Sequence, residues 1–139
     1  MTLTESGPTS IAVADTVLVV EDEVLIRMVI AQYLRDCGYR VIEAASADEA
    51  VIVLKQSELR IDAVLSDVEM PGTMDGFGLA RWVRQNRAGL EVILVGSPAR
   101  AADAAADLCE SGPAFAKPYE PRAVVDQIRR LLGQRTSRK

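Results

Sequence analysis

The sequence predicts one α/β domain built on a parallel sheet, and three observations support this prediction. Short aliphatic stretches alternate with segments of helical periodicity, which gives five β/α units in succession. Strict alternation implies parallel strands, right-handed crossovers and helices on both faces of the sheet. The chain has 139 residues, of which 49% are hydrophobic and 26% charged, enough to form a single hydrophobic core.

The first β/α unit begins with an uninterrupted apolar strand at Val17–Val20. Val24–Asp36 follows with helical spacing, because its apolar side chains recur at i, i+3, i+4 and i+7. The expected buried residues of this helix are Ile26, Val29, Ile30 and Tyr33. Gly38 stands where a glycine commonly ends a helix.

The second unit opens with a strand expected at Arg40–Ala44. Ser46 and Glu49 stand three residues apart just before the apolar run Val51–Leu54. This spacing is the pattern of a capping box and predicts the start of the second helix.

The third unit combines a buried strand at Asp62–Ser66, a turn at Pro71-Gly72 and a helix opened by Asp75. The residues expected to be buried by this helix are Phe77, Ala80 and Val83 or their neighbours.

The last two units are predicted from a fourth strand at Glu91–Val95 and an Ala-rich helix at Ala99–Glu110. Few large apolar side chains occur in that helix, so loose packing is expected. Phe115 lies in a short fifth strand, and a final helix runs from Pro121 to Gly133. Its expected buried residues are Val124, Ile128, Leu131 and Leu132.

Charged residues stand at the ends of three of these strands. Glu21 and Asp22 follow the first, Asp67 the third, and Lys117 the fifth. Carboxyl ends of parallel strands meet at one edge of a sheet, with neighbours about 4.8 Å apart, so these side chains are expected to converge. Oxygen ligands favour a hard cation, and Mg²⁺ fits best, with Ca²⁺ as an alternative. An aspartate in such a site can form an aspartyl phosphate.

At these residues the chain resembles the CheY-like receiver domains of two-component response regulators, over about residues 16 to 133. The resemblance rests on three motifs, Val17–Glu23, Leu65–Gly76 and Lys117–Tyr119. It implies a flavodoxin-like fold, with a five-stranded parallel sheet in the order 2-1-3-4-5 doubly wound by five helices. Residues 1–15 and 134–139 are then tails around a receiver domain at 16–133, and the chain is expected to be a stand-alone receiver.

The resemblance also implies a role for each charged residue. Asp67 would accept a phosphoryl group from a phosphohistidine of a sensor histidine kinase or a histidine phosphotransfer protein. Asp22, Asp67 and the backbone carbonyl of Glu69 would bind Mg²⁺ directly, and Glu21 would act through water. Lys117 would pair with the phosphoryl oxygens. Such a domain switches the binding of a downstream protein and catalyses only its own phosphotransfer and dephosphorylation.

Two departures from the family pattern concern the switch. Receivers usually carry Ser or Thr at the end of the fourth strand, but this chain has Gly96 there and Ser97 one residue later. Either Ser97 reaches the phosphoryl group by a shift that Gly96 permits, or the segment is simply the turn that starts the next helix. Ala114 stands where many receivers carry Tyr or Phe, and Phe115 is expected to point to the other face.

Two other functions stay open as alternatives. The chain would be a non-phosphorylated interaction module if the switch residues have lost their role. A magnesium phosphohydrolase is disfavoured, because Glu69 occupies the place where such an enzyme usually carries a second aspartate as general acid.

Charge and composition narrow the partners further. The net charge of -4 argues against direct contact with nucleic acid or an anionic membrane. Without a long apolar stretch or a signal peptide pattern, the expected location is the cytoplasm. The downstream target is unknown, and a homodimer stays open. Cys37 and Cys109 are far apart in sequence, so we expect partly buried thiols, without a disulfide or a metal.

Overall fold

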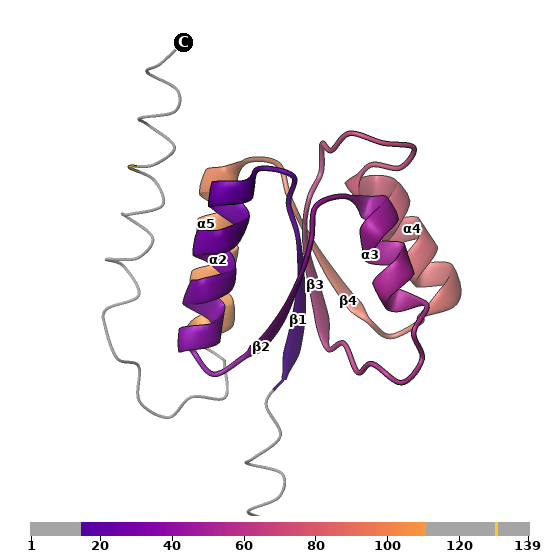
Figure 1. Ribbon diagram of the computed structural model, residues 1–139, viewed down its shortest axis with the longest axis horizontal. Coiled ribbons are helices and arrows are strands. Elements are labelled where there is room, and N and C mark those ends of the chain that lie inside the picture. Colours follow the sequence, from indigo (N-terminus) through magenta and orange to yellow (C-terminus); the bar gives the residue numbers. More distant parts are fainter. Residues whose placement is uncertain (1–14, 111–129, 131–139) are drawn as a thin grey trace, which may run out of the picture.

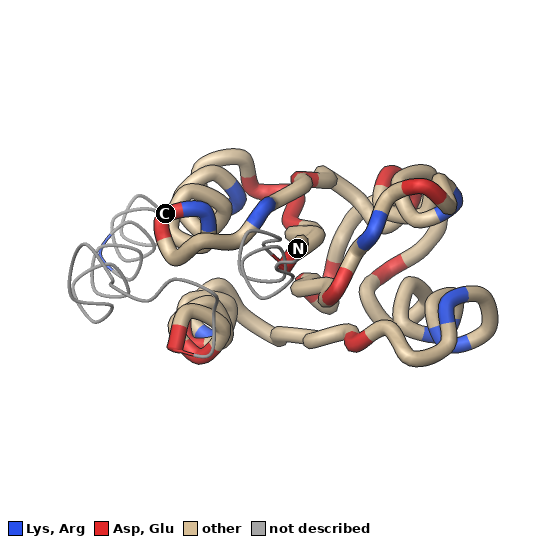
Figure 2. Tube along the Cα trace, turned by 90° about the horizontal axis from the view of Figure 1, so that it is seen from below, with Lys and Arg blue, Asp and Glu red and all other residues tan. Residues whose placement is uncertain are grey.

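Four parallel strands form one sheet in the order β2-β1-β3-β4 in the computed structural model, which describes residues 15–110 and Arg130. The strands are β1 (Thr16–Val20), β2 (Arg40–Ala44), β3 (Ala63–Asp67) and β4 (Glu91–Val95). The helices are α2 (Val24–Asp36), α3 (Ala47–Leu54), α4 (Gly76–Asn86) and α5 (Pro98–Glu110). Helices α2 and α5 cover one face of the sheet, and α3 and α4 cover the other (Figures 1 and 2).

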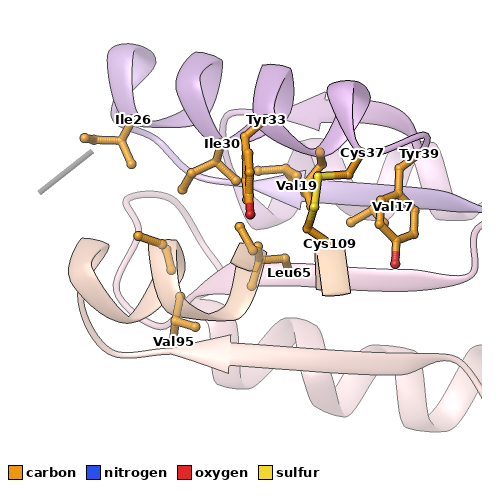
Figure 3. Close-up of a cluster of buried hydrophobic side chains, with 14 residues drawn as sticks. Val17, Val19, Ile26, Ile30, Tyr33, Cys37, Tyr39, Leu65, Val95 and Cys109 are labelled. Atoms are coloured by element: carbon orange, nitrogen blue, oxygen red, sulfur yellow. A yellow bond between two sulfur atoms is a disulfide. The ribbon is translucent and has the colours of Figure 1, made fainter. Parts of the chain in front are cut away.

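The central strand β1 explains why the core has two halves. Successive side chains of a strand point to opposite faces. Val17 and Val19 therefore pack under α2 and α5 (Figure 3), whereas Leu18 and Val20 pack under α3 and α4. All four are at most 1% exposed. A strand buried on both faces needs an unbroken apolar sequence, and β1 has one.

Helix α2 has the predicted bounds, Val24–Asp36. Ile26, Ile30 and Tyr33 are buried as predicted, and Val29 packs at the edge of the same cluster. Gly38 ends the helix with a φ of 100°, a conformation that costs little only for glycine. Its amide donates to the Arg35 carbonyl and the Tyr39 amide to the Leu34 carbonyl, which together form a Schellman motif.

The predicted cap of α3 is also present. The Ser46 hydroxyl accepts a hydrogen bond from the Glu49 amide at 3.2 Å. The Glu49 carboxylate reaches back to the amide of Ala45, one residue before the position that a capping box usually uses.

Three other elements have boundaries that differ from the predictions by one residue. Strand β1 begins at Thr16, one residue before the predicted start. Strand β3 runs from Ala63 to Asp67, because Asp62 instead brackets the start of β1: its amide donates to the Thr16 carbonyl and its carboxylate accepts from the Thr16 amide. Helix α5 begins at Pro98, since proline suits the first turn of a helix.

The prediction that Phe77 is buried was wrong, because its side chain is 52% exposed. Leu79 and Val83 form the buried face of α4, and Ala80 is partly buried. Each residue turns a helix by about 100°, so Phe77 lies about 200° from Leu79, on the opposite side. At its start the helix is attached to the segment after β3, because the Gly76 amide donates to the Val68 carbonyl at 2.9 Å, and Asp75 caps it by accepting from the Gly78 amide at 2.8 Å.

The prediction of free thiols was also wrong, because Cys37 and Cys109 form a disulfide. Cys37 caps the C-terminus of α2 and Cys109 lies in the last turn of α5, two helices that pack side by side on one face (Figure 3). The bond joins positions 72 residues apart. In the chain-entropy treatment, a cross-link over a loop of that length stabilises the folded state by about 4 kcal/mol.

The predicted fifth strand at Phe115 lies outside the described residues, as do most of both expected tails. Of the predicted final helix from Pro121 to Gly133 only Arg130 is described, and it is helical. Within the part that is described, no helix is long and apolar enough to cross a membrane.

Candidate functional site

Three carboxylates meet at the carboxyl ends of β1 and β3. Glu21, Asp22 and Asp67 each offer one oxygen, and these oxygens lie within 4.8 Å of one another. Strands β1 and β3 are direct neighbours with Val20 opposite Ser66, so the residues that follow both strands emerge side by side. The sequence prediction that these three side chains converge is confirmed. Glu21 is buried, Asp67 is partly buried and Asp22 is exposed.

Backbone hydrogen bonds hold Glu21 in place. Its amide donates to the Ala44 carbonyl of β2 at 3.1 Å, which extends the β1–β2 pairing by one residue. Its carboxylate accepts from the Glu23 amide at 3.0 Å and so closes the turn that leads into α2. The acidic residues therefore stand on a turn that is fixed at both ends.

Arg27 anchors the same turn from within α2, and the sequence analysis missed it. Its guanidinium donates to the Glu21 carbonyl at 2.9 Å and forms an ion pair with Glu43 of β2 at 3.2 Å. Arg35 pairs with the other oxygen of Glu43 at 3.3 Å but is more exposed. Only the folded arrangement reveals this network, because its members come from different elements.

Burial and neighbouring charges raise the pKa of two of these carboxyl groups, Glu21 and Asp67. Burial is the largest cause for Glu21 and, with repulsion from Asp67 and Asp22, raises its pKa to about 7, against an opposing hydrogen bond from the Glu23 amide. Burial also raises the pKa of Asp67, and the charges of Asp22 and Glu69 act in the same direction. A bound cation would relieve this repulsion. The three groups offer only oxygen, the ligand type that Mg²⁺ and Ca²⁺ prefer.

The loop between β3 and α4 brings Glu69 beside the cluster. The Gly76 amide donates to the Val68 carbonyl at 2.9 Å, which closes the loop at its base. A side chain at Gly76 would collide with the backbone of Asp67 and Val68, so only glycine permits this approach. The Glu69 amide lies 3.4 Å from an Asp67 carboxylate oxygen, while the Glu69 side chain is exposed.

Hydrogen bonds between the tip of this loop and α3, which the sequence analysis also missed, anchor the loop. Thr73 donates to the Asp48 carboxylate from its hydroxyl at 2.8 Å and from its amide at 3.3 Å. The Pro71-Gly72-Thr73 segment is therefore anchored, by a contact between positions 25 apart in the sequence that no local pattern indicated.

The end of β4 is followed by Gly96 and Ser97, the two residues at which the sequence departs from the family pattern. The Ser97 hydroxyl accepts a hydrogen bond from the Arg100 amide at 3.2 Å, so Ser97 caps the start of α5. This geometry corresponds to the expectation of a turn that starts the helix. A Cβ atom placed on Gly96 would meet no atom within 4 Å, so the usual side-chain position is open space. The predicted site residues Lys117, Ala114 and Phe115 lie outside the described residues.

A family profile described as the response regulator receiver domain matches residues 17–129. Among curated proteins, ResD, a transcriptional regulatory protein of Bacillus subtilis, is 34% identical over 116 residues, covering 84% of this chain and 47% of ResD. The sensor kinase CckA of Brucella abortus is 34% identical over 127 residues, covering 89% of this chain and 13% of the kinase. This chain thus spans less than half the length of either relative.

Solved structures show the same fold. The chemotaxis response regulator CheY4 of Vibrio cholerae aligns with a TM-score of 0.54 and 28% sequence identity, covering 85% of this chain and 98% of that one. A receiver domain protein from Clostridium thermocellum aligns with a TM-score of 0.56 at 23% identity, covering 90% and 99%. The arrangement of parallel sheet and flanking helices is therefore a flavodoxin-like α/β fold.

The Glu21 carboxyl predicts how stability depends on pH. Its pKa is about 7 in the folded protein against an ordinary value of 4.5, so the folded state binds the proton more tightly. The resulting stabilisation is complete below pH 4.5 and is lost as pH rises through 7. Urea unfolding in a chelator is expected to show declining stability across this range, and Glu21→Gln is expected to flatten the decline. Glu58→Gln, at an exposed carboxylate, serves as control; equal flattening by both would contradict the assignment.

Arg27→Met is expected to lower the free energy of unfolding by about 1–3 kcal/mol, because the substitution leaves partly buried acceptors without their donor. Arg35→Met is the matched control: it removes the exposed partner of the same Glu43 and is expected to cost less than about 1 kcal/mol. Urea titration of both variants measures the difference. Equal losses would show that Arg27 does not anchor the turn through the Glu21 carbonyl.

Proposed function

The chain belongs to the response regulator receiver domain family of two-component signalling, and from this premise we propose that Asp67 accepts a phosphoryl group and thereby switches partner binding. The observation that carries the proposal is the convergence of Asp67 with Glu21 and Asp22 at adjacent strand ends. A lone acidic residue at a strand end has many structural uses. Three carboxylates that lie close together despite their mutual repulsion are suited to binding a cation together with a phosphoryl group.

The proposed metal ligands are Asp22, Asp67 and the backbone carbonyl of Glu69, with Glu21 acting through water. When bound, Mg²⁺ would neutralise the charge that spreads over the phosphoryl oxygens during transfer. Glu21 is the most buried of the three carboxylates and is fixed by the Glu23 amide, which suits an outer position. Asp22 is exposed and so is open to a partly hydrated ion.

Asp67 is the proposed nucleophile. One of its carboxylate oxygens attacks phosphorus, the bond from phosphorus to the donor's histidine nitrogen breaks, and an acyl phosphate forms on Asp67. Lys117 is proposed to pair with the phosphoryl oxygens. The turn anchored by Arg27 and the loop anchored by Thr73 keep the chain's own groups fixed, so little reorganisation is needed during transfer.

The phosphodonor is proposed to be a sensor histidine kinase or a histidine phosphotransfer protein, and the relative CckA is itself named a sensor kinase. An apolar surface that such a partner could contact lies next to the acidic cluster. Val24, Leu25 and Met28, in the first turns of α2, are 53%, 60% and 53% exposed. Exposed apolar side chains grouped on one helix often mark a protein interaction site.

The remaining partners follow from charge and fold. Lys and Arg positions are interspersed with Asp and Glu positions along the trace (Figure 2), and the net charge is -4, which disfavours direct nucleic acid binding. A cytoplasmic location is proposed, with a downstream protein as target and no external enzymatic substrate. We also propose that Phe115 belongs to a fifth strand beside β4, completing the order 2-1-3-4-5 in a domain of residues 16–133.

Ser97 favours a second candidate, a receiver-like interaction module that works without phosphorylation. Its hydroxyl caps α5, and Gly96 offers no other hydroxyl at the end of β4. Such a module would bind its partner equally well with or without a phosphoryl mimic. The two candidates are separated by whether Asp67 can be labelled and whether labelling changes α5.

Incubation with a small acyl phosphate and Mg²⁺ is expected to add one phosphoryl group to the chain, measured by intact mass. Asp67→Asn is expected to abolish this labelling, because an amide cannot form the acyl phosphate. Asp75→Asn is a suitable control: it keeps an oxygen that can cap α4 and leaves the acidic cluster unchanged. Labelling that persists in Asp67→Asn, or that needs no divalent cation, would contradict the proposal.

Gly96→Ser is expected to strengthen the binding of beryllium fluoride, a phosphoryl mimic, because the new side chain enters open space one residue after Val95, which pairs with Asp67. A charge-assisted hydrogen bond of about 1.5–3 kcal/mol corresponds to a gain of about 10- to 150-fold in affinity. Titration with Mg²⁺ present measures the gain. If Ser97 already supplies that bond, Ser97→Ala will weaken binding by a similar factor and Gly96→Ser will change little.

A further inference from the structure

The disulfide between Cys37 and Cys109 connects the two helices that cover one face of the sheet (Figure 3). Both cysteines are 1% exposed, and their Cα atoms lie 5.4 Å apart. These are the chain's two cysteines, so the bond has no competing thiol within the chain. Disulfides in proteins exposed to cytoplasmic reductants are uncommon and are usually redox-sensing when present.

We propose that Cys37 and Cys109 form a redox-modification site at which a dithiol protein of the thioredoxin type controls the freedom of α5. In the oxidised chain the C-terminal end of α5 is tied to α2, and in the reduced chain it is released. The redox site stands on the disulfide itself; its coupling to signalling rests on the proposed function of Asp67.

Helix α5 depends on the disulfide because its other packing is weak. Its buried residues besides Cys109 are three alanines, Ala101, Ala102 and Ala105. The neighbouring α2 buries much larger side chains, namely Ile26, Ile30, Tyr33 and Leu34. Burial free energy scales with the apolar area removed from water, so alanines hold a helix far less strongly. Apart from packing, the Tyr39 hydroxyl donates to the Leu108 carbonyl at 2.6 Å, next to the disulfide.

The two ends of α5 connect the disulfide to the acidic site. The helix starts directly after Ser97, and the preceding Val95 carbonyl accepts from the Val68 amide, next to Asp67. The thirteen residues of α5 form a rod about 20 Å long, with Cys109 in its last turn. A groove of about 600 Å³ along α5 is lined by residues that include Gly96, Ser97 and Arg100. Because the helix moves as a rod, a disulfide at its C-terminal end restricts how far its N-terminal end at Ser97 can move.

Reduction proceeds by two thiol–disulfide exchanges. A thiolate of the dithiol protein attacks one sulfur, forms a mixed disulfide and releases the other cysteine as a thiolate, which takes up a proton. The second thiol of the reductant then attacks the mixed disulfide and releases the remaining cysteine. Two electrons pass to this chain, and the reductant becomes a disulfide. Access requires fraying of the last turn of α5, where Glu110 is exposed and helix ends open more readily than helix interiors.

The test uses the full chain, oxidised or treated with thioredoxin and its reducing system, with the redox state read by alkylation and intact mass. Native protein is expected to take up two alkyl groups after treatment and none before. Amide hydrogen exchange in the last two turns of α5 is expected to rise at least tenfold on reduction, with α3 on the opposite face unchanged. Failure of thioredoxin to reduce the folded chain, or equal exchange in both states, would overturn the proposal.

Two variants separate the disulfide from other effects. The double variant Cys37→Ala, Cys109→Ala is expected to exchange like the reduced chain and to ignore thioredoxin. Tyr39→Phe removes the neighbouring hydrogen bond but keeps both sulfurs, so it is expected to retain the redox difference. If the double variant fails to fold, reduction of the unchanged chain still decides the question. A redox effect that persists without cysteines would overturn the assignment.

The coupling is read with beryllium fluoride and Mg²⁺. The mimic is expected to change exchange in α5 at least twice as much in the reduced chain as in the oxidised chain, and equal changes would overturn the coupling. An acyl phosphate that labels neither form would overturn the proposed function of Asp67 instead. In that case the alkylation and hydrogen-exchange results alone would decide the redox proposal. Failure of the redox proposal and failure of the proposed function of Asp67 are therefore distinguishable.

Discussion

Parallel pairing of β1 with β3 is the constraint on which the acidic site depends. The register places Val20 opposite Ser66, so Glu21 and Asp22 leave their strand beside Asp67. Neighbouring strands lie about 4.8 Å apart, and the three carboxylate oxygens approach one another within that same spacing. The pairing holds against their repulsion because both strands are buried on both faces. Side chains such as Leu18 and Val64 have no exposed surface.

This arrangement links folding to ligand binding. Burial and mutual repulsion raise the pKa of Glu21 to about 7 and also raise that of Asp67, so the ionised cluster costs folding free energy near neutral pH. A cation that binds only the folded state recovers part of this cost by mass action. Arg27 opposes the displacement that this repulsion favours, because it fixes the backbone of the turn and leaves the carboxylates free to bind.

The sequence predicted what depends on local pattern and failed where contacts join distant segments. The helix at Val24–Asp36 and the cap at Ser46 follow from side chains a few residues apart. Convergence of Asp22 and Asp67 followed from topology, since parallel strands must bring their carboxyl ends together. Phe77 was misassigned because helical periodicity fixes a face only once the first residue is known. The disulfide and the contacts of Arg27 and Thr73 depend on tertiary distances that no spacing encodes.

The acidic cluster and the path from it to α5 also differ in how strongly the fold constrains them. The acidic cluster is built into the sheet, so its geometry persists as long as β1 and β3 pair. The path to α5 is less constrained, because Gly96 has no side chain and the Ser97 hydroxyl already caps the helix. A helix that buries mainly alanines has little packing of its own to hold it at the far end. Contacts near both ends therefore matter for its position: the cap at Ser97, the disulfide at Cys109 and the hydrogen bond from the Tyr39 hydroxyl to the Leu108 carbonyl. A change that reaches partners through α5 is expected to act on these contacts.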